Sequence, residues 1–416
     1  MSRERVEVYA DWHPIEKPLL IGQLAYSDLS RGGVFSFAYD KAFLTSPYCL
    51  QIDPLLTLHA GELYNDEANK NFRAFLDSSP DRWGRILMQR RAAIEYRKGI
   101  RPSNRVTELD YLLGVHDAYR MGGIRFKKVG SHHFLDNNDD FAAPPMASLR
   151  ELEHAAIQIE KDDNIDSDEY YHWLRMLISP GSSLGGARPK ACVTDEKTHL
   201  WIAKFPNIND TFDVGAWEMV CYELALAAGI EVSPSEIRKL STKHHTFLTK
   251  RFDRIGDKRL HFSSAMTQLQ YYDGEHSHGA SYLEIAEFLS NQGSQTKTDL
   301  AQLWRRIVFN IAVSNTDDHL RNHGFLLTGK GWKLSPAYDL NPMVGKKGLH
   351  LNITESDNAL DYQLAFDVID FFRLTQIEAM QIYDEVLNTV KQWQQVAQRL
   401  GISRAEQTMK EEAFNV

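Results

Sequence analysis

The sequence predicts an α+β protein, and two patterns of apolar residues carry that prediction. Over residues 5–52 apolar side chains alternate with a period of two, as Val6 and Val8 do, and later Leu24 and Tyr26. Such alternation is typical of a half-buried antiparallel sheet with hairpin connections. Beyond residue 280 the apolar side chains recur at helical spacing, so the last third of the chain should be mostly α-helical.

Composition limits the classes of protein that this chain can be. With 416 residues, 43% hydrophobic and 25% charged, it reads as a globular protein of two or three domains. A net charge of -9 and a pI near 6.0 argue against direct high-affinity nucleic-acid binding by the chain alone. Any role on DNA would need a basic partner.

Cysteine usage and hydropathy indicate where the protein works. Cys49, Cys192 and Cys221 lie far apart and form no C-x-x-C pair, which suggests a reducing compartment. No apolar run approaches the roughly 20 residues that span a bilayer, and the N-terminus lacks the apolar core of a secretory signal. We expect a cytoplasmic protein with no membrane partner.

The first 126 residues predict an accessory α+β module. After the predicted sheet, residues 78–81 (SSPD) suit a helix start, and residues 107–110 (TELD) suit another. This part contains no group of residues with catalytic spacing. Residues 127–150, with a His-His and a Pro-Pro pair, predict a surface excursion that acts as a linker.

A small-residue loop opens the next predicted segment, residues 151–258. Residues 181–190, GSSLGGARPK, precede a short strand, a turn and a second strand ending near Phe205. A glycine-rich turn lets backbone N–H groups approach phosphates closely. The loop is not a Walker A motif, because Ala187 stands where that motif needs lysine. An ordinary hairpin is the alternative explanation.

A lysine and a glutamate then suggest a nucleotide site. Lys204 lies in an otherwise apolar strand, where a lysine is costly to bury without a partner. Glu218 lies beside the apolar face of a helix that residues 211–213 cap and Gly229 ends. A strand lysine paired with a helix glutamate positions phosphates in protein kinases. The alternative is that both side chains are simply solvated.

The remaining elements predict a hinge strand followed by a helical lobe, residues 259–416. Residues 246–254 form a strand that runs into a charged connector, where a bilobal nucleotide enzyme contacts adenine. Helices are predicted around residues 281–292 and 300–311. Residues 375–400 predict one long helix, with Ile377, Met380, Val386 and Val390 on a core-facing stripe.

Residues 314–342 hold the densest cluster of chemistry. Asp317 is followed five positions later by Asn322, and an apolar strand-turn-strand leads to Asp339. A D-x-x-x-x-N loop supplies one acid that faces a hydroxyl and one amide for a metal, while a downstream aspartate holds Mg²⁺. Turn capping by aspartate and asparagine is the alternative for each residue alone.

The order of these parts is restrictive: small-residue loop, strand lysine, helix glutamate, hinge strand, helical lobe, Asp317 with Asn322, then Asp339. It predicts a bilobal kinase-like architecture, in which a mixed α/β N-terminal lobe with an accessory β-rich module precedes a mostly α-helical C-terminal lobe. The motifs SSLGGARPK, WIAKFP, LTKRFDR, NTDDHLRN and LSPAYDL resemble those of the HipA-type serine/threonine kinases, the toxins of bacterial HipA–HipB modules.

The resemblance implies specific roles for residues of this chain. It implies that Asp317 is the catalytic base, that Asn322 and Asp339 hold Mg²⁺, and that Glu218 partners Lys204. Ser183 falls on the position that family members autophosphorylate, which silences them. The implied ATP contacts are Ser183, Gly185, Gly186, Ala187, Lys190, Lys204, Lys250, Phe252, His319 and Tyr338. Asp318 departs from the family, because some members have glycine there.

The resemblance also implies cofactors and partners. The cofactors are ATP and Mg²⁺, and the substrate is a protein serine or threonine, with an aminoacyl-tRNA synthetase as one candidate target. A small helix-turn-helix antitoxin similar to HipB is the implied partner, and the chain would contact operator DNA through this antitoxin.

Two other classes of protein stay open. One is a metal-dependent hydrolase using Asp317, Asp318, His319 and His323. The other is an inactive nucleotide-binding subunit of a repressor complex.

Overall fold

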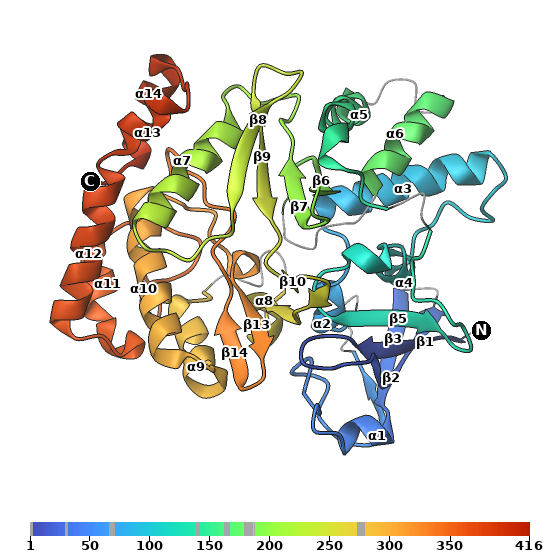
Figure 1. Ribbon diagram of the computed structural model, residues 1–416. Coiled ribbons are helices and arrows are strands. Elements are labelled where there is room, and N and C mark those ends of the chain that lie inside the picture. Colours follow the sequence, from blue (N-terminus) through green and yellow to red (C-terminus); the bar gives the residue numbers. More distant parts are fainter. Residues whose placement is uncertain are drawn as a thin grey trace. The chain divides into compact units, whose positions relative to one another are not determined.

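The computed structural model describes residues 3–29, 32–65, 71–138, 142–161, 167–178, 186, 188–272 and 279–416 (Figure 1). The chain forms two compact units. The first comprises residues 1–208 and 253–263, and the second residues 209–252 and 264–416. Residues 151–258, which the sequence assigns to one lobe, therefore contribute to both units.

A five-stranded antiparallel sheet forms the start of the first unit, in the order β4-β3-β2-β1-β5. Val6 and Val8 of β1 are buried and pair with Leu24 and Gly22 of β2, so the alternation in sequence places one face in the core. The strands are β1 (Arg3–Ala10), β2 (Leu19–Leu29), β3 (Gly32–Tyr39), β4 (Glu62–Tyr64) and β5 (Ile124–Lys128).

Helices follow this sheet where polar side chains can cap them. Asp81 caps α3 by accepting from the Gly84 N–H at 2.9 Å, so the helix begins two residues later than a first-turn Pro80 predicts. Thr107 and Asp110 form the predicted capping box of α4. The helices are α1 (Lys41–Leu44), α2 (Arg73–Leu76), α3 (Arg82–Arg97), α4 (Glu108–Leu113), α5 (Leu149–Lys161) and α6 (Asp168–Ile178).

Two hairpins complete the first unit. One joins β6 (Lys190–Thr194) to β7 (Leu200–Lys204), with Lys190 opposite Lys204. The other joins β10 (Arg254–Ile255) to β11 (Lys258–Arg259). Asp253 accepts from the Gly122 N–H at 2.9 Å, and Arg259 donates to the Asp117 carbonyl at 2.7 Å. These buried bonds fix residues 253–263 to the N-terminal module.

The second unit combines two hairpins with helices. Asp213 caps α7 through the Ala216 N–H, and it also accepts from the backbone N–H of His245 in β9. The strand β12 (Phe262–Ser264) spans the boundary between the units. The strands are β8 (Ser235–Lys239), β9 (His245–Lys250), β13 (Gly324–Thr328) and β14 (Gly331–Leu334). The helices are α7 (Val214–Ala227), α8 (Ala265–Gln268), α9 (Tyr282–Gln292), α10 (Thr296–Ala312), α11 (Tyr362–Asp367), α12 (Gln376–Val390), α13 (Trp393–Arg399) and α14 (Arg404–Lys410).

The core of the second unit surrounds α10, whose Leu303, Trp304, Ile307 and Ile311 are fully buried. The prediction of a single helix over residues 375–400 is wrong. The chain instead forms α12 and α13, which break at residues 391–392. Ile377 and Met380 were placed on the core stripe, yet they are 81% and 43% exposed. The prediction failed because only two residues separate the helices. The helical spacing of apolar residues therefore continues almost unchanged from α12 into α13.

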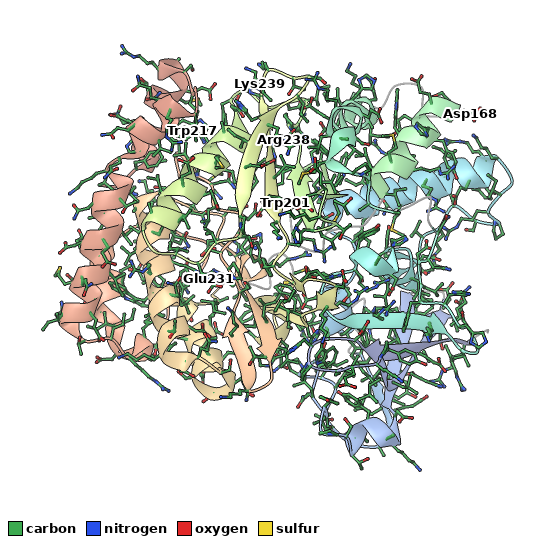
Figure 2. The ribbon with its side chains drawn as sticks, viewed as in Figure 1. Asp168, Trp201, Trp217, Glu231, Arg238 and Lys239 are labelled. Atoms are coloured by element: carbon green, nitrogen blue, oxygen red, sulfur yellow. The ribbon has the colours of Figure 1, made fainter. Side chains whose placement is uncertain are left out.

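The C-terminal segment packs onto α7 through aromatic rings. Trp217, labelled in Figure 2, lies with its ring centroid 6.1 Å from those of both Trp393 and Phe414. Phe414 stacks on Trp393 at 4.2 Å. These large rings bury much apolar area, so they fix the C-terminal segment against α7.

Two polar contacts fix the same segment to residues 314–342. Lys410, which is buried, donates through Nζ to the Pro342 carbonyl at 2.8 Å. Asn415 donates through Nδ2 to Ser314 Oγ at 2.9 Å. The C-terminal segment therefore holds both ends of the stretch that the sequence marks as the candidate site. Within the described residues, no helix combines the length and the apolar character that a membrane crossing demands.

Candidate active site

The candidate site begins where α10 ends and the chain turns into residues 314–323. Asp317 is exposed there, whereas its neighbour Asp318 is only 3% exposed. Two adjacent aspartates thus have opposite environments. An exposed carboxylate is available to a substrate, and a buried one needs hydrogen-bond donors around it. The structure therefore separates two residues that look equivalent in the sequence.

Hydrogen bonds between residues close in sequence stabilise the loop around Asp317. Its carbonyl accepts from the His319 N–H at 3.0 Å and from Asn322 Nδ2 at 3.0 Å, and the His319 carbonyl accepts from the Asn322 N–H at 2.8 Å. Asn322 Oδ1 is buried and has no hydrogen-bond partner among the described residues. With its amide nitrogen engaged, Asn322 presents a free carbonyl oxygen, the kind of hard ligand that Mg²⁺ prefers.

Asp339 lies in a strained backbone conformation. Its φ is +63°, in the left-handed region that a non-glycine residue seldom adopts. Just before it, the Ala337 N–H donates to the Glu231 carbonyl at 2.7 Å, and the Tyr338 hydroxyl donates to the Arg321 carbonyl at 2.7 Å. Tyr338 therefore fixes the Asp339 segment to the loop that carries Asp317.

The donor set fits a hard divalent cation. Asn322 supplies a buried oxygen without a partner, and Asp339 supplies a carboxylate on a segment that is hydrogen-bonded to the same loop. One or two side-chain oxygens, with phosphates and water for the rest, suit Mg²⁺. These two residues would hold the ion.

Asp318 is the centre of a buried polar network. Its Oδ2 accepts from the Tyr282 hydroxyl and from Asn310 Nδ2 at 2.7 Å, and it lies 2.9 Å from His323 Nε2. Burial alone would raise the pKa of this carboxyl, but the charge and hydrogen bonds of His323 and the other donors hold it below its ordinary value. Burial and the nearby Asp318 charge raise the pKa of Tyr282 well above its ordinary value.

This network rules against the predicted metal-hydrolase set. Asp318 and His323 are 3% and 2% exposed and bind each other, so neither faces a ligand. Among the residues that the structure describes, no group of three histidine, cysteine or acidic side chains is arranged to hold a metal. The hydrolase hypothesis is therefore not supported.

The first unit holds Lys190, the lysine that ends the predicted phosphate loop. Lys190 Nζ lies 2.8 Å from Asp81 Oδ2, and both side chains are buried, so the contact is an ion pair between β6 and the start of α3. Gly186 has a φ of +94°, and a Cβ placed on it would lie 3.3 Å from the Lys190 amine. Three predicted loop residues, Ser183, Gly185 and Ala187, lie outside the described residues.

The other predicted ATP contacts are distributed over both units. Lys204 is half-buried at the end of β7 in the first unit, whereas Glu218 is 5% exposed on α7 in the second. Their pairing stays a prediction. Lys250 ends β9, and the ring of Phe252 lies 5.7 Å from that of Tyr338, which brings the predicted hinge close to the Asp339 segment.

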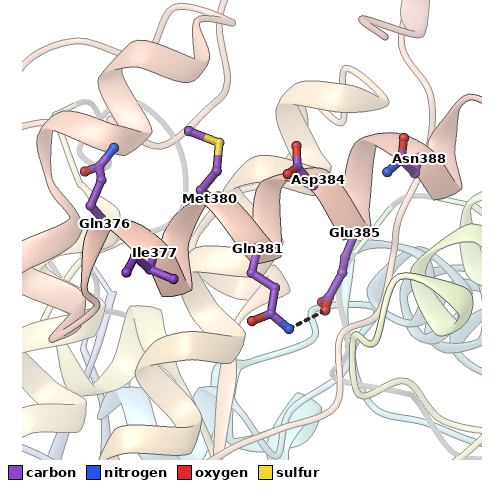
Figure 3. Close-up of a pocket in the computed structure, with 7 residues that line it drawn as sticks. All are labelled: Gln376, Ile377, Met380, Gln381, Asp384, Glu385 and Asn388. Carbon is purple, nitrogen blue, oxygen red and sulfur yellow. Dashed lines mark hydrogen bonds between the residues drawn. The ribbon is translucent and has the colours of Figure 1, made fainter.

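A shallow hollow on the outer face of α12 contains none of the predicted site residues (Figure 3). All its lining residues come from that one helix, with Gln381 donating to Glu385 at 3.0 Å. It is a helix surface and not an enclosed cavity.

Sequence reasoning missed the residues that support the loop. Tyr282 and Asn310 both lie on helices that were interpreted only from their apolar spacing, and both are buried and donate to Asp318. The signal for Asn310 was present: an asparagine among Ile307, Phe309 and Ile311 is a polar residue inside a core helix.

Comparison with known proteins agrees with the predicted resemblance. A HipA of Shewanella oneidensis, solved as a toxin–antitoxin complex with HipB and operator DNA, is similar in fold, with a TM-score of 0.64 and 16% identity. The match covers 98% of this chain and 94% of that one. The α+β prediction is confirmed.

A sequence relative covers less of the chain. The "Putative kinase Y4mE" of Sinorhizobium fredii is 30% identical over 148 residues, which is 33% of each protein. The HipA-like C-terminal domain family matches residues 182–411, more than half of the 416 residues. The chain therefore belongs to the family of proteins with a HipA-like C-terminal domain.

Proposed function

We propose that this chain is a protein kinase that transfers the γ-phosphoryl group of ATP to a serine or threonine hydroxyl. The observation that carries the proposal is the arrangement around residues 314–342: an exposed Asp317, a free oxygen on Asn322, and Asp339 on a segment hydrogen-bonded to the same loop. The kinase name of the Sinorhizobium relative and the HipA fold support it.

In the proposed reaction each residue has a separate task. The Asp317 carboxylate orients the acceptor hydroxyl and takes its proton as the phosphoryl group moves. Asn322 and Asp339 supply oxygens for Mg²⁺. Bound Mg²⁺ neutralises the charge of the phosphates. Asp339 has a left-handed backbone conformation, a kind of strain that is found at functional sites.

The lysines and aromatic residues complete the proposed ATP site. Lys204 contacts the phosphates with Glu218 as its partner, and the small-residue loop with Gly186 and Lys190 covers them. Phe252 and Lys250 line the adenine side, and Tyr338 and His319 complete the set. Ser183 is the proposed autophosphorylation site, and a Ser183→Ala protein that loses activity during ATP incubation as fast as the wild type would contradict that role.

The test of the kinase proposal uses labelled ATP and Mg²⁺ with the full-length chain. Wild-type protein should incorporate phosphate into itself or an acceptor protein. Asp317→Asn should lower the rate by about 100- to 10,000-fold, because the general base is lost. Asp384→Asn, an exposed aspartate on α12, is the matched control and should leave the rate unchanged. Equal rates for wild type and Asp317→Asn would refute the assignment, and ATP binding with no turnover would favour an inactive nucleotide-binding subunit.

The proposed kinase activity also suggests partners and a biological role. By analogy with the Shewanella complex, we propose a HipB-like helix-turn-helix partner that bridges the acidic chain to operator DNA. We also propose a growth-inhibiting toxin in the cytoplasm, with an aminoacyl-tRNA synthetase as candidate target. Expression of the wild type should arrest growth, and Asp317→Asn should not. Equal toxicity of both proteins would separate toxicity from phosphoryl transfer.

A further inference from the structure

The relation between the two segments that carry Asp317 and Asp339 depends on a side chain that belongs to neither. Asn310 lies on α10 and is 1% exposed. Its Nδ2 donates to Asp318 Oδ2 at 2.7 Å, and its Oδ1 accepts from Asn315 Nδ2 at 3.1 Å. Both ends of this amide are therefore engaged with the loop around Asp317.

The same chain of amides continues to the second segment. Asn315 Oδ1 accepts from the backbone N–H of Asn341 at 3.2 Å, and Asn341 lies two residues after Asp339. The path from Asp318 to Asn341 thus consists of three hydrogen bonds through two asparagine side chains. Each asparagine both donates and accepts, so neither amide group can turn over without breaking the path.

Asp318 anchors the path at its other end. Its donors come from α9, α10 and the residue after Asn322, namely Tyr282, Asn310 and His323. Removing water from a carboxylate is costly unless donors replace it. A hydrophobic residue would fill this position more simply. That the chain buries an acid beside Asp317 despite this cost therefore indicates that the loop geometry must be fixed.

We propose that Asp318 and Asn310 are positioning residues, which set the placement of Asp317 and Asn322 relative to Asp339 through this hydrogen-bonded path. This proposal rests on the proposed kinase function for its catalytic part. Neither residue touches substrate: each acts through the loop that holds Asp317 and Asn322. The adjacent aspartates therefore divide the work, with Asp317 facing the hydroxyl and Asp318 holding it in place.

The test compares Asp318→Asn with Asp299→Asn in the full-length protein. Asp299 lies on α10 and is also a buried carboxylate, and it accepts from the Leu334 N–H at 3.1 Å, away from the loop. Asp318→Asn should lower kcat for labelled-phosphate incorporation by about 10- to 100-fold, as loss of a ligand's supporting partner does. At saturating Mg²⁺, KM for MgATP should change by less than about threefold, because the side chains that are proposed to bind ATP are unchanged. Asp299→Asn should change neither.

Hydrogen exchange provides a readout that does not depend on catalysis. The Asn315 N–H donates to the Asn310 carbonyl on α10, and the N–H groups of His319 and Asn322 donate within the loop to the carbonyls of Asp317 and His319. Asp318→Asn should speed exchange in peptides covering residues 314–323 by about tenfold or more, and Asp299→Asn should not. Unchanged exchange and unchanged kcat in Asp318→Asn would overturn the proposal.

The outcomes separate the two proposals. If the wild type incorporates no phosphate but Asp318→Asn still loosens residues 314–323, the kinase assignment fails and the positioning role stands. If Asp318→Asn does not fold, Tyr282→Phe removes one donor only and takes its place. Its control is Tyr39→Phe, which loses a buried hydroxyl bond to the Leu56 carbonyl in the first unit. Equal exchange in these two variants would also overturn the proposal.

Discussion

Asp317 and Asp318 are the same amino acid at neighbouring positions, yet one is exposed and the other is buried. The sequence placed the catalytic role on Asp317 through its five-residue spacing to Asn322. It offered no way to see that Asp318 binds Tyr282, because that contact joins residues 36 positions apart. Spacing along one loop can be read from a sequence, whereas partners on other helices require the packing.

The free oxygen of Asn322 leads to a prediction about Mg²⁺. Asn322→Leu keeps the number of heavy atoms in the side chain but removes its free oxygen, together with the amide nitrogen that donates to the Asp317 carbonyl. The Mg²⁺ concentration for half-maximal phosphate incorporation should rise on the order of tenfold or more. A magnesium titration with labelled ATP measures this. Asn388→Leu, at an exposed position on α12, is the control, and an equal shift in both variants would rule out Asn322 as a ligand.

His261 leads to a prediction about acid stability of the first unit. Burial lowers its pKa to about 3, and its ring stacks on Trp12 at 4.6 Å. Below a pH of about 6.5 the unfolded chain binds a proton that the folded chain excludes, so the free energy of unfolding falls as pH drops. Between pH 7 and pH 5, this one histidine should lower the free energy of unfolding by about 2 kcal/mol.

Urea unfolding at both pH values checks that expectation. His261→Phe keeps an aromatic ring against Trp12. Between pH 7 and pH 5 its free energy of unfolding should fall by about 2 kcal/mol less than that of the wild type. His132→Phe changes an exposed histidine, and its free energy of unfolding should depend on pH as that of the wild type does. A His261→Phe protein with the wild-type pH dependence would mean that the ring is protonated in the folded state.

At the scale of elements, helix starts were the most predictable features. Thr107 and Asp213 cap helices whose starts the sequence predicted at these positions, and Ser281 caps the helix predicted around residues 281–292, because a cap needs only a side chain and an N–H two or three residues away. The break at residues 391–392 was missed because no glycine or proline marks it. Local hydrogen bonds are visible in a sequence, and changes of helix direction without such a marker are not.

The contact of α7 with β9 gives a prediction at this scale. A Cβ placed on Gly215 would lie 2.3 Å from the His245 carbonyl oxygen, so Gly215→Ala must push α7 away from the strand. We expect a loss of stability of about 1–3 kcal/mol, typical of overpacking. Thermal unfolding measures it. Gly329→Ala is the control because nothing lies within 4 Å of its Cβ, and equal melting temperatures for the two variants would show that the helix adjusts freely.

At the scale of the whole molecule, the division into units could not be foreseen. Residues 253–258 end the predicted N-terminal lobe and residues 259–263 begin the predicted helical lobe, yet both segments belong to the first unit. Their place there depends on buried bonds of Asp253 and Arg259 to residues more than a hundred positions earlier. Charged residues that serve as core partners look in a sequence like a solvated loop.

This arrangement predicts the behaviour of fragments. Residues 1–208 alone leave the Gly122 N–H and the His13 N–H without their partners on Asp253 and Arg259. Gly122 is buried, and an unsatisfied buried N–H costs about 1–3 kcal/mol, so the fragment should be open to proteolysis. The same fragment joined by a flexible linker to residues 253–263 should be resistant. Equal protease resistance of the two fragments would contradict this account of the first unit.

The contacts of Lys410 and Asn415 also bear on the order of events during synthesis. Ser314 and its partner Asn415 are 101 residues apart, and Pro342 and Lys410 are 68 apart. A growing chain therefore exposes the Asp317 loop long before the ribosome releases the residues that hold it. On this basis the proposed kinase stays without its full support, and so of low activity, until translation has passed residue 415.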